Sequence, residues 1–402
     1  MKKNLLFGLC KSKGTQATYG LLIALVTFCI TECDSPDNNF YKFDPRTLKE
    51  NKFTLSEIAD EVTYVPLENS FPLGVIFNIK FINNTIFFSS KDIGIMAFDR
   101  KGKALRKIGT VGRGPGEYLY KNNFTVDEKT GTVYILDRGD IIKVFSRTGQ
   151  FIRSFPLQEY GGSEAIEFYN SNLFVSYAIQ FENARYKWIV FDTLGNAIKK
   201  KEREISMFTA NYGNNETIYK FENSIFYWNN YTDTVFSLLP DLKNEPSFII
   251  SPGEHRPPMA KLSFEQLMQN KFLNLFKIFE TSRFFVLRYF YNRPTLTLID
   301  KNNQEAFLIY LEYENENCLN GIENDVDGGY FFIPEYYFTE KDREFMVGLV
   351  YPFQIKAFVT TNEFKNSLAK YPQKKKELEK LANSLKETDN PVLMMVRLKK
   401  QN

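Results

Sequence analysis

Histidine and cysteine, which supply many catalytic and metal-binding groups in proteins, are scarce in this sequence. Among 402 residues there is one histidine, His255. A multi-histidine zinc site is therefore excluded, and a Ser-His-Asp triad would have to use this one residue. The four cysteines are Cys10, Cys29, Cys33 and Cys318, and the first two lie in an N-terminal apolar segment. If Cys33 is modified, Cys318 is left unpaired, and no disulfide framework or cysteine-based metal site can form.

An excess of charge is also missing. The formal net charge of the chain is +3, and removal of residues 1–32 leaves 47 basic and 47 acidic residues. Because nucleic-acid binding depends on a strong basic excess, we expect no nucleic-acid partner. Hydrophobic residues make up 43% of the chain, which is enough for a folded core.

The N-terminal segment has the layout of a secretory signal. Four lysines precede an apolar run from about Leu21 to Ile30, which is too short to cross a bilayer as a helix. Cys33 follows, and after it comes the polar stretch DSPDNN.

This segment resembles a bacterial lipoprotein signal, in which the cysteine is acylated and becomes the first mature residue. Glu32 departs from that pattern, which has a small residue at this position. The resemblance implies a signal peptide over residues 1–33, lipidation of Cys33 and a tether over residues 34–60. It places the protein in the envelope of a Gram-negative-type bacterium, in the periplasm or at the outer membrane, with membrane contact through the lipid alone. An ordinary cleaved signal or an uncleaved anchor stays open.

A strand-and-turn unit recurs along the rest of the chain. MAFDRKG, KVFSRTG and IVFDTLG carry Phe98, Phe145 and Phe191, which stand 47 and 46 residues apart. Weaker copies follow in TVFSLLPD, TLTLIDKNN and LMMVRLKK. Six units with a period in the forties and a turn in each predict the blades of a β-propeller.

The second unit predicts four strands to a blade. Short apolar or alternating runs, rich in β-branched and aromatic residues, are separated by turns. The expected strands are Phe124–Asp127, Thr132–Leu136, Ile141–Phe145 and Phe151–Phe155. The predicted fold is an all-β, six-bladed propeller of four-stranded blades with helical insertions on one face.

The sequence GRGPGEY followed by VDEKTGTVYILDRGDIIKVFSRTGQFI resembles the NHL-repeat pattern. The chain as a whole resembles the bacterial six-bladed β-propeller lipoproteins related to those repeats. The likeness is strongest over residues 95–157 and returns in DNPVLMMVRLK at the end of the chain. It implies a fold and an export route, and it assigns no activity. The related lyases rely on histidine metal ligands that this chain lacks.

Closure of the ring is predicted from the two ends of the domain at residues 61–402. EVTYVPLE, residues 61–68, is strand-like but precedes the first blade, while PVLMMVRLK ends the last blade one strand short. The N-terminal strand is therefore expected to complete blade six, which removes open sheet edges.

The glycine-rich stretch IGTVGRGPGEY, residues 108–118, is predicted to be a connector between blades. A phosphate loop needs Lys and Ser or Thr after its last glycine, but Glu117 and Tyr118 follow here. A dinucleotide-binding loop would open a helix, whereas strand sequence comes next. In propellers such outer-to-inner connectors share one face with the loops between the second and third strands.

Two insertions are expected on that face. Residues 251–275 lie between blades four and five, and residues 361–390 lie inside blade six. In the second insertion Leu378, Leu381, Ala382 and Leu385 have the spacing of an amphipathic helix. This helix either packs over the ring or binds a partner.

The candidate ligand-binding residues are aromatic and polar side chains of the loops on the same face. Rigid rings with polar tips suit sugars or peptides, although ordinary surface packing is the alternative for each residue. The set is Arg113, Tyr118, Arg138, Asp140, Arg185, Tyr231, His255, Arg256, Tyr291 and Arg293.

The functional prediction is a non-catalytic binding module for a carbohydrate, a peptide or a partner protein of the envelope. One alternative is a calcium-dependent lactonase-like or lyase enzyme at the propeller axis, where Asp127 and Glu167 could contribute oxygen ligands. The other is a structural scaffold of an envelope complex.

Overall fold

The computed structural model describes residues 42–400 with short gaps, and all of these belong to one compact unit, Phe40–Asn402. The gaps are residues 120–122, 158–159, 161, 181–184, 205, 207, 213–215, 270 and 315–316. The predicted signal peptide, Cys33 and the first part of the predicted tether lie outside the described residues. Within the described ranges, no helix is long and apolar enough to cross a membrane.

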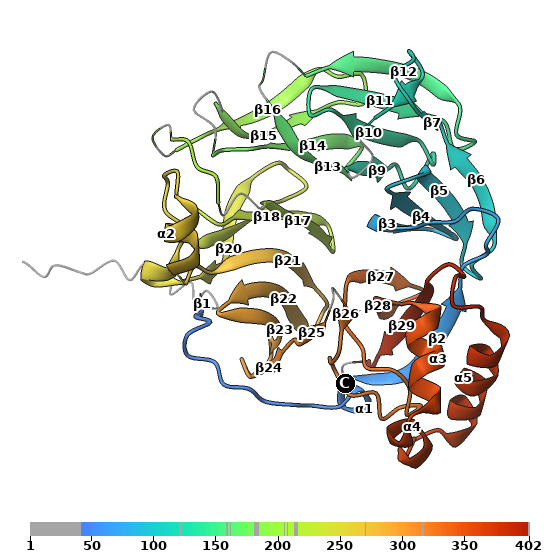
Figure 1. The fold of residues 1–402 in the computed structure, drawn as a ribbon. Helices are drawn as coiled ribbons and strands as arrows, with labels where there is room; N and C mark the ends of the chain where they lie inside the picture. Colours follow the sequence, from blue (N-terminus) through green and yellow to red (C-terminus); the bar gives the residue numbers. More distant parts are fainter. Residues whose placement is uncertain are drawn as a thin grey trace, which may run out of the picture. The chain divides into compact units, whose positions relative to one another are not determined.

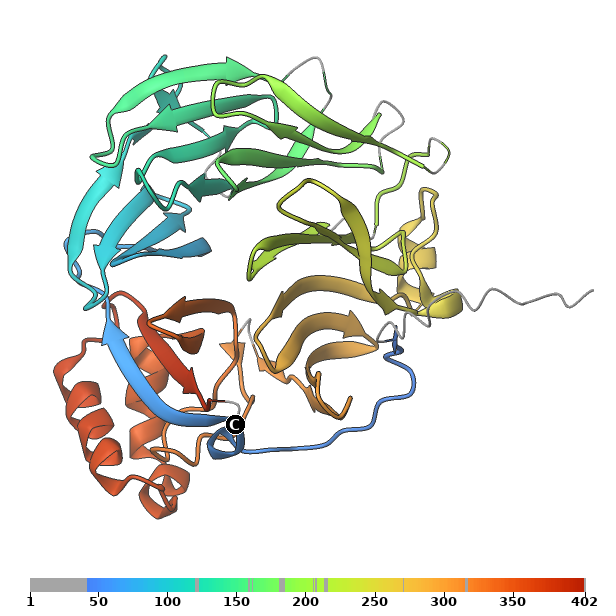
Figure 2. The same cartoon turned by 180° about the vertical axis from the view of Figure 1, so that it is seen from behind.

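Six four-stranded blades surround a common axis and form the predicted β-propeller (Figure 1 and Figure 2). Blade one is β3 (Ile76–Ile82), β4 (Thr85–Ser90), β5 (Gly94–Asp99) and β6 (Ala104–Ile108); blade two is β9 (Phe124–Val126), β10 (Val133–Asp137), β11 (Ile141–Phe145) and β12 (Phe151–Pro156); blade three is β13 (Ser163–Tyr169), β14 (Asn172–Tyr177), β15 (Tyr186–Phe191) and β16 (Ala197–Glu202). Blade four is β17 (Glu216–Phe221), β18 (Ser224–Asn229), β19 (Thr234–Leu238) and β20 (Asn244–Ile250); blade five is β21 (Asn274–Glu280), β22 (Phe284–Tyr291), β23 (Arg293–Asp300) and β24 (Ala306–Tyr310); blade six is β27 (Tyr336–Glu340), β28 (Arg343–Val350), β29 (Val392–Leu398) and β2 (Ala59–Pro66). The all-β, six-bladed prediction is confirmed.

The hydrophobic core lies between neighbouring blades. Phe98, Phe145 and Phe191 of the repeated unit are all fully buried. The cluster between blades one and two joins Ile95 of β5 to Phe124 of β9 and to Phe145. Because blades pack on both faces, their middle strands are continuous apolar runs.

A shared turn between the third and fourth strands explains the sequence repeat. Its first residue is Asp99, Ser146 or Asp192 in blades one to three, and the side-chain oxygen accepts hydrogen bonds of 2.8 to 3.3 Å from backbone N–H groups two and four residues on. The fourth residue is glycine, and Gly149 has a φ of +87°. Polar cap and left-handed glycine together fix the turn.

The turn glycine also packs against the preceding blade. The carbonyl of Gly149 accepts a hydrogen bond of 2.9 Å from the N–H of Gly109. A Cβ on Gly149 would lie 2.2 Å from the carbonyl oxygen of Lys107, and one on Gly102 would lie 2.1 Å from that of Pro66. The repeat therefore encodes contact between blades as well as a turn.

The N-terminal strand β2 is the outer strand of blade six. It pairs antiparallel with β29, and Val62 stands opposite Val396. This is the position that the strand pattern of residues 61–68 predicts.

The chain before β2 is part of the propeller. Strand β1 (Lys42–Phe43) pairs in parallel with β20, and helix α1 (Leu55–Ile58) leads into β2. Phe43 and Phe53 are buried, and the ring of Phe53 lies 4.6 Å from that of Phe307 in blade five. The prediction of a tether over residues 34–60 is thus wrong from residue 42 onward, because these aromatic side chains join the core.

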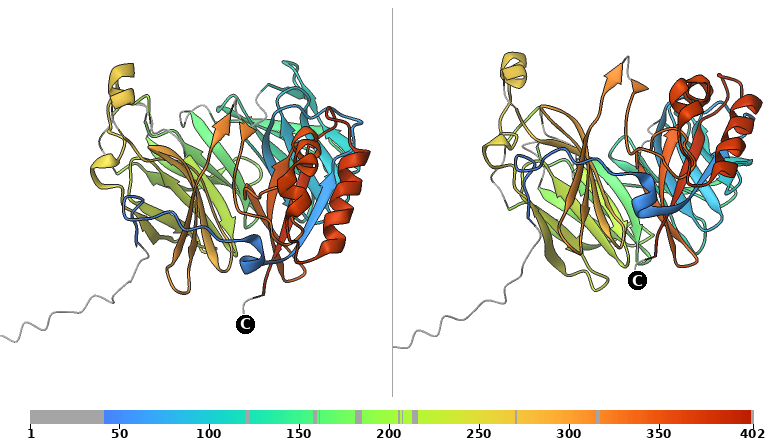
Figure 3. Two further views of the ribbon diagram at one scale, coloured as in Figure 1. Left: turned by 60° about the horizontal axis from the view of Figure 1, so that its bottom comes forward. Right: turned by 90° about the horizontal axis from the view of Figure 1, so that it is seen from below.

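Three connectors carry extra structure, and α2, the β25–β26 hairpin and the C-terminal helices rise from the same side of the ring (Figure 3). The connector from β20 to β21 holds η2 (Gly253–His255) and α2 (Phe264–Gln269). The connector from β24 to β27, which the sequence analysis did not predict, holds the hairpin β25 (Tyr313–Glu314) and β26 (Asn317–Cys318). The connector from β28 to β29 holds α3 (Pro352–Thr360), α4 (Asn362–Asn366) and α5 (Pro372–Ser384).

The helical insertion of blade six packs over the ring. It begins at Pro352, earlier than the expected 361–390, since Tyr351-Pro352 starts α3 with proline at a position that needs no N–H. Leu378 and Ala382 of α5 are buried, as the amphipathic spacing predicts. The apolar face of α5 is therefore used for packing within the protein, as the first of the two alternatives predicts.

A buried carboxylate lies where the β24–β27 connector meets β2 and α5. The Oδ1 atom of Asp327 accepts hydrogen bonds from the N–H of Gly329 (2.8 Å) and Nδ2 of Asn324 (2.6 Å), and Tyr64 of β2 donates a longer one (3.4 Å). Its Oδ2 atom is buried without a hydrogen-bond partner among the described residues. Burial raises the pKa of Asp327 to about 6, and Lys374 of α5 offsets this only in part.

Candidate functional site

Two of the predicted ligand residues are core residues. Tyr118 is fully buried, and its hydroxyl donates to the carbonyl of Ile108 and accepts from the N–H of Ile95, both at 2.8 Å. Tyr231 is 1% exposed, and its hydroxyl donates to the carbonyl of Tyr212. Both predictions were wrong, because the rings fill the space beneath their loops and the hydroxyls hold backbone groups.

The predicted arginines that are exposed lie on different blades. Arg138 is 4.0 Å from Asp137, Arg185 pairs with Glu202 at 2.8 Å, and Arg293 lies over the ring of Tyr310 at 4.3 Å. The exposed Arg113 belongs to the connector between blades one and two, and the partly buried Asp140 belongs to a loop of blade two. The described contacts do not bring these residues into one site.

His255, Arg256 and Tyr291 do come together, on the rim of blades four and five. The His255 ring lies 5.2 Å from that of Tyr291, and its Nδ1 contacts the carbonyl of Lys271 at 3.0 Å. Arg256 forms an ion pair with Asp233. These contacts brace the insertion against the ring.

The axial carboxylates do not fit a calcium site. Glu167 forms an ion pair with Lys80 and accepts a hydrogen bond of 2.9 Å from Thr125. Asp127 accepts hydrogen bonds from the N–H of Lys129 (2.9 Å) and the hydroxyl of Thr130 (2.6 Å) in its own turn. A lysine ammonium takes the place that a cation would need, and no cluster of three or more metal-binding side chains occurs in the described part of the chain.

A channel of about 790 Å³ runs along the inner strands and is lined by all six blades. Two of its lysines pair with carboxylates of other blades: Lys80 with Glu167, and Lys220 with Glu128 at 2.7 Å. The lining has five cationic and five carboxylate side chains, so the channel is close to neutral.

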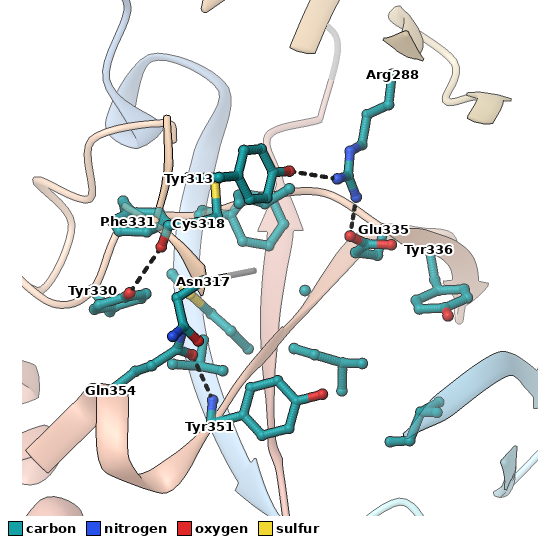
Figure 4. A pocket seen from close by; sticks show the side chains of 17 residues that line it. Arg288, Tyr313, Asn317, Cys318, Tyr330, Phe331, Glu335, Tyr336, Tyr351 and Gln354 are labelled. Carbon is teal, nitrogen blue, oxygen red and sulfur yellow. Dashed lines mark hydrogen bonds and ion pairs between the residues drawn. The ribbon is translucent and has the colours of Figure 1, made fainter. Parts of the chain in front are cut away.

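At the loop-bearing end of the channel lies a pocket of about 300 Å³, which we call the mouth pocket. Arg288 of β22, Glu335 and Tyr336 at the start of β27, the hairpin β25–β26 and the N-terminus of α3 line it. Figure 4 shows Arg288, Tyr313 and Glu335 together at one end and Asn317, Gln354 and Tyr351 at the other.

The local fold holds these side chains in place. Asn320 fixes the base of the hairpin, since its Nδ2 donates to the carbonyl of Tyr310 and its Oδ1 accepts from the N–H of Glu312, both at 2.9 Å. Gln354 caps α3, because its Oε1 accepts a hydrogen bond of 2.9 Å from the N–H of Tyr351.

Two cations share the carboxylate of Glu335 at one end of the pocket. Lys277 and Arg288 are opposite each other on β21 and β22, and both form ion pairs with Glu335, Lys277 at 2.9 Å. Burial would raise the pKa of Glu335, but the two cations outweigh it and hold this pKa below its usual range. The Nη2 group of Arg288 donates a hydrogen bond of 3.1 Å to the hydroxyl of Tyr313.

Rings form much of the wall. Tyr313 is 43% exposed, and Tyr330, Phe331, Phe332, Tyr336 and Tyr351 complete the aromatic lining. Lys277 lies 4.2 Å from the ring of Tyr336. Aromatic surfaces beside fixed polar groups are typical of ligand sites.

Comparison with known families assigns the chain. A family model described as Domain of unknown function (DUF4934) matches residues 40–397. The chain belongs to this family. A search of curated proteins finds no match.

Of three solved structures that are similar to this DUF4934 protein, the first supports the fold. A Bacteroides fragilis NCTC 9343 protein whose name predicts export is 18% identical, with a TM-score of 0.64 over 90% of this chain and 99% of that one. A DUF4221 family member from Bacteroides vulgatus is 11% identical, with a TM-score of 0.49 over 85% and 98%. A streptogramin B lyase is 11% identical, with a TM-score of 0.42 over 71% and 80%.

The thiol in the mouth pocket of the DUF4934 protein is not poised as a nucleophile. Cys318 donates a hydrogen bond of 3.3 Å to the carbonyl of Asn320, and burial raises the pKa of its thiol. A cysteine nucleophile acts as the thiolate, which this environment disfavours.

Sequence reasoning came close to the pocket but missed it. Tyr291 and Arg293 were chosen, whereas the residue that lines the pocket is Arg288, which precedes Tyr291 on β22. The aromatic run GGYFFIPEYYF, residues 328–338, is the signal that could have drawn attention to the connector.

Proposed function

We propose that this protein is an envelope β-propeller that binds a ligand at its mouth pocket without transforming it. The observation that carries this proposal is the ion pair of Arg288 with Glu335 among aromatic side chains at the loop-bearing end of the channel, where Lys277 also pairs with Glu335 from the channel side. A carbohydrate, a peptide or a segment of an envelope protein could occupy such a pocket.

Binding suits the chemistry of the pocket better than catalysis. Glu335 is a weak base because its pKa is lowered by two cations, and the thiol of Cys318 is held neutral. The calcium-dependent alternative at the axis finds no support in Asp127 and Glu167, whose oxygens are engaged by neighbouring groups. A structural scaffold would differ in giving no response to small ligands.

Filling the pocket should abolish binding. Asn317 is exposed on β26 and lines the mouth pocket, so Asn317→Trp is expected to occupy it with little cost to the fold. A glycan or peptide that raises the melting temperature of the parent protein should bind the variant at least about tenfold more weakly.

The matched control is Leu319→Trp, which adds the same ring two residues away at a side chain that is 50% exposed and outside the pocket. It should leave affinity unchanged. Equal affinity of the parent protein and Asn317→Trp would move the binding site elsewhere.

We also propose export with a lipid anchor at Cys33. The signal-like N-terminus supports it, as does the predicted export of the similar Bacteroides fragilis protein. Cys33→Ala is expected to abolish labelling by a fatty-acid analogue in cells, while Cys29→Ala should label normally. Labelling that persists in Cys33→Ala would exclude this acceptor.

A further inference from the structure

The mouth pocket has more hydrogen-bond donors to offer than acceptors. The Oε1 atom of Gln354 accepts a hydrogen bond from the N–H of Tyr351, so its amide NH₂ group is the part that can donate to a ligand. Tyr336 and Tyr351 also line the pocket, and each hydroxyl can donate one hydrogen bond. The one carboxylate, Glu335, is already shared by two cations.

The charged groups at the pocket also favour a negatively charged ligand. Arg288 is the one cation and Glu335 the one carboxylate among the residues that line the pocket, and Lys277 pairs with Glu335 from the channel side. The three groups together carry one net positive charge. The second terminal nitrogen of Arg288 is held only by the hydroxyl of Tyr313, an exposed residue that an incoming group can displace. A guanidinium edge of this kind matches a carboxylate.

From this surplus of donors and positive charge we propose that the mouth pocket recognises a carboxylate-bearing sugar, such as a uronic acid residue of a glycan. This rests on the proposed binding function and names its ligand class. The carboxylate accepts hydrogen bonds from Arg288, and the sugar ring lies against the tyrosine rings. A volume of about 300 Å³ accommodates a single such residue.

A sugar is favoured over a peptide carboxylate by the nature of the lining. The free polar groups named above are side-chain groups, whereas an extended peptide is held largely by a row of backbone groups. Six aromatic residues in so small a pocket provide flat surfaces for a pyranose ring.

The test compares oligogalacturonate with the same oligosaccharide fully methyl-esterified, by calorimetry on the purified protein. The pair differs in charge but not in stereochemistry. We expect the acid to bind at least tenfold more tightly than the ester, and the difference to shrink as salt is raised. Arg288→Lys keeps the positive charge beside Glu335 but loses the guanidinium edge, and it should lose most of the preference for the acid.

Arg293→Lys is the control, since Arg293 begins the adjacent strand β23 but lies outside the pocket. Equal binding of acid and ester would overturn the acidic preference and leave the binding function standing. A preference retained in Arg288→Lys would also overturn the proposed contact. If neither oligosaccharide binds but a peptide with a free carboxylate binds tightly, the sugar proposal is overturned. If no glycan or peptide binds, the binding function itself is overturned. The comparison on the parent protein decides the matter even if Arg288→Lys does not fold.

Discussion

Gly149→Ala is expected to destabilise the propeller by about 3 kcal/mol, because a left-handed alanine costs about 1–2 kcal/mol and overpacking adds about 1–3 more. Gly149 has a φ of +87°, and its new methyl group would meet the carbonyl oxygen of Lys107 at 2.2 Å. Relief of that clash would separate blades one and two at the hydrogen bond from Gly109. Denaturant unfolding of the purified protein measures the loss.

Gly162→Ala is the matched control. Gly162 is exposed, its φ is not in the left-handed range, and no atom lies within 4 Å of its added Cβ. A change within about 0.5 kcal/mol is expected there. If both variants unfold like the parent protein, the turn glycine is not needed for contact between the blades.

Asp327→Asn is expected to stabilise the protein at pH 7.5 by about 1–3 kcal/mol, since a pKa difference of one unit corresponds to about 1.4 kcal/mol. The pKa of Asp327 is raised from 3.8 to about 6 by burial. The stability that follows from this raised pKa is fully present below about pH 4 and is lost as the pH rises through 6. At neutral pH the buried carboxylate is charged, and asparagine removes that charge while its Oδ1 can accept the same hydrogen bonds.

The pH profile separates Asp327 from other groups. Burial also raises the pKa of Glu164, to about 7, so the parent protein should lose stability from pH 5 to 7.5 through both carboxyls. The gain from Asp327→Asn should be smaller at pH 5 than at pH 7.5, by about 1 kcal/mol. Asp342→Asn, at an exposed left-handed turn position that asparagine accepts, serves as the control. A gain independent of pH would show that ionisation of Asp327 is not its cause.

The fold was predictable because its local and long-range requirements coincide in the same residues. Asp99 and Gly102, Ser146 and Gly149 form turns whose glycines are also the contacts between blades, so the repeat is visible in the sequence. The β24–β27 connector has no such period, and it was missed.

The site was harder to predict because its chemistry is assembled across blades. Glu335 immediately precedes the first strand of blade six, while Lys277 and Arg288 are on two strands of blade five, and only the packing of the two blades brings them together. Some aromatic residues in loops were wrongly predicted to bind ligand because they pack inside the protein. Tyr118 looks like a surface ring in sequence, but its hydroxyl bonds backbone groups of blade one.

The pairing of β2 with β29 also sets the order in which the ring is completed. Asp60 and Arg397 form an ion pair across this seam, although 337 positions separate them in the chain. Contacts this distant form slowly because a long loop must close first. During synthesis β2 emerges before its partner strand exists, so its edge stays unpaired and open to aggregation. The first blade strand to be made is therefore among the last to be incorporated into the ring.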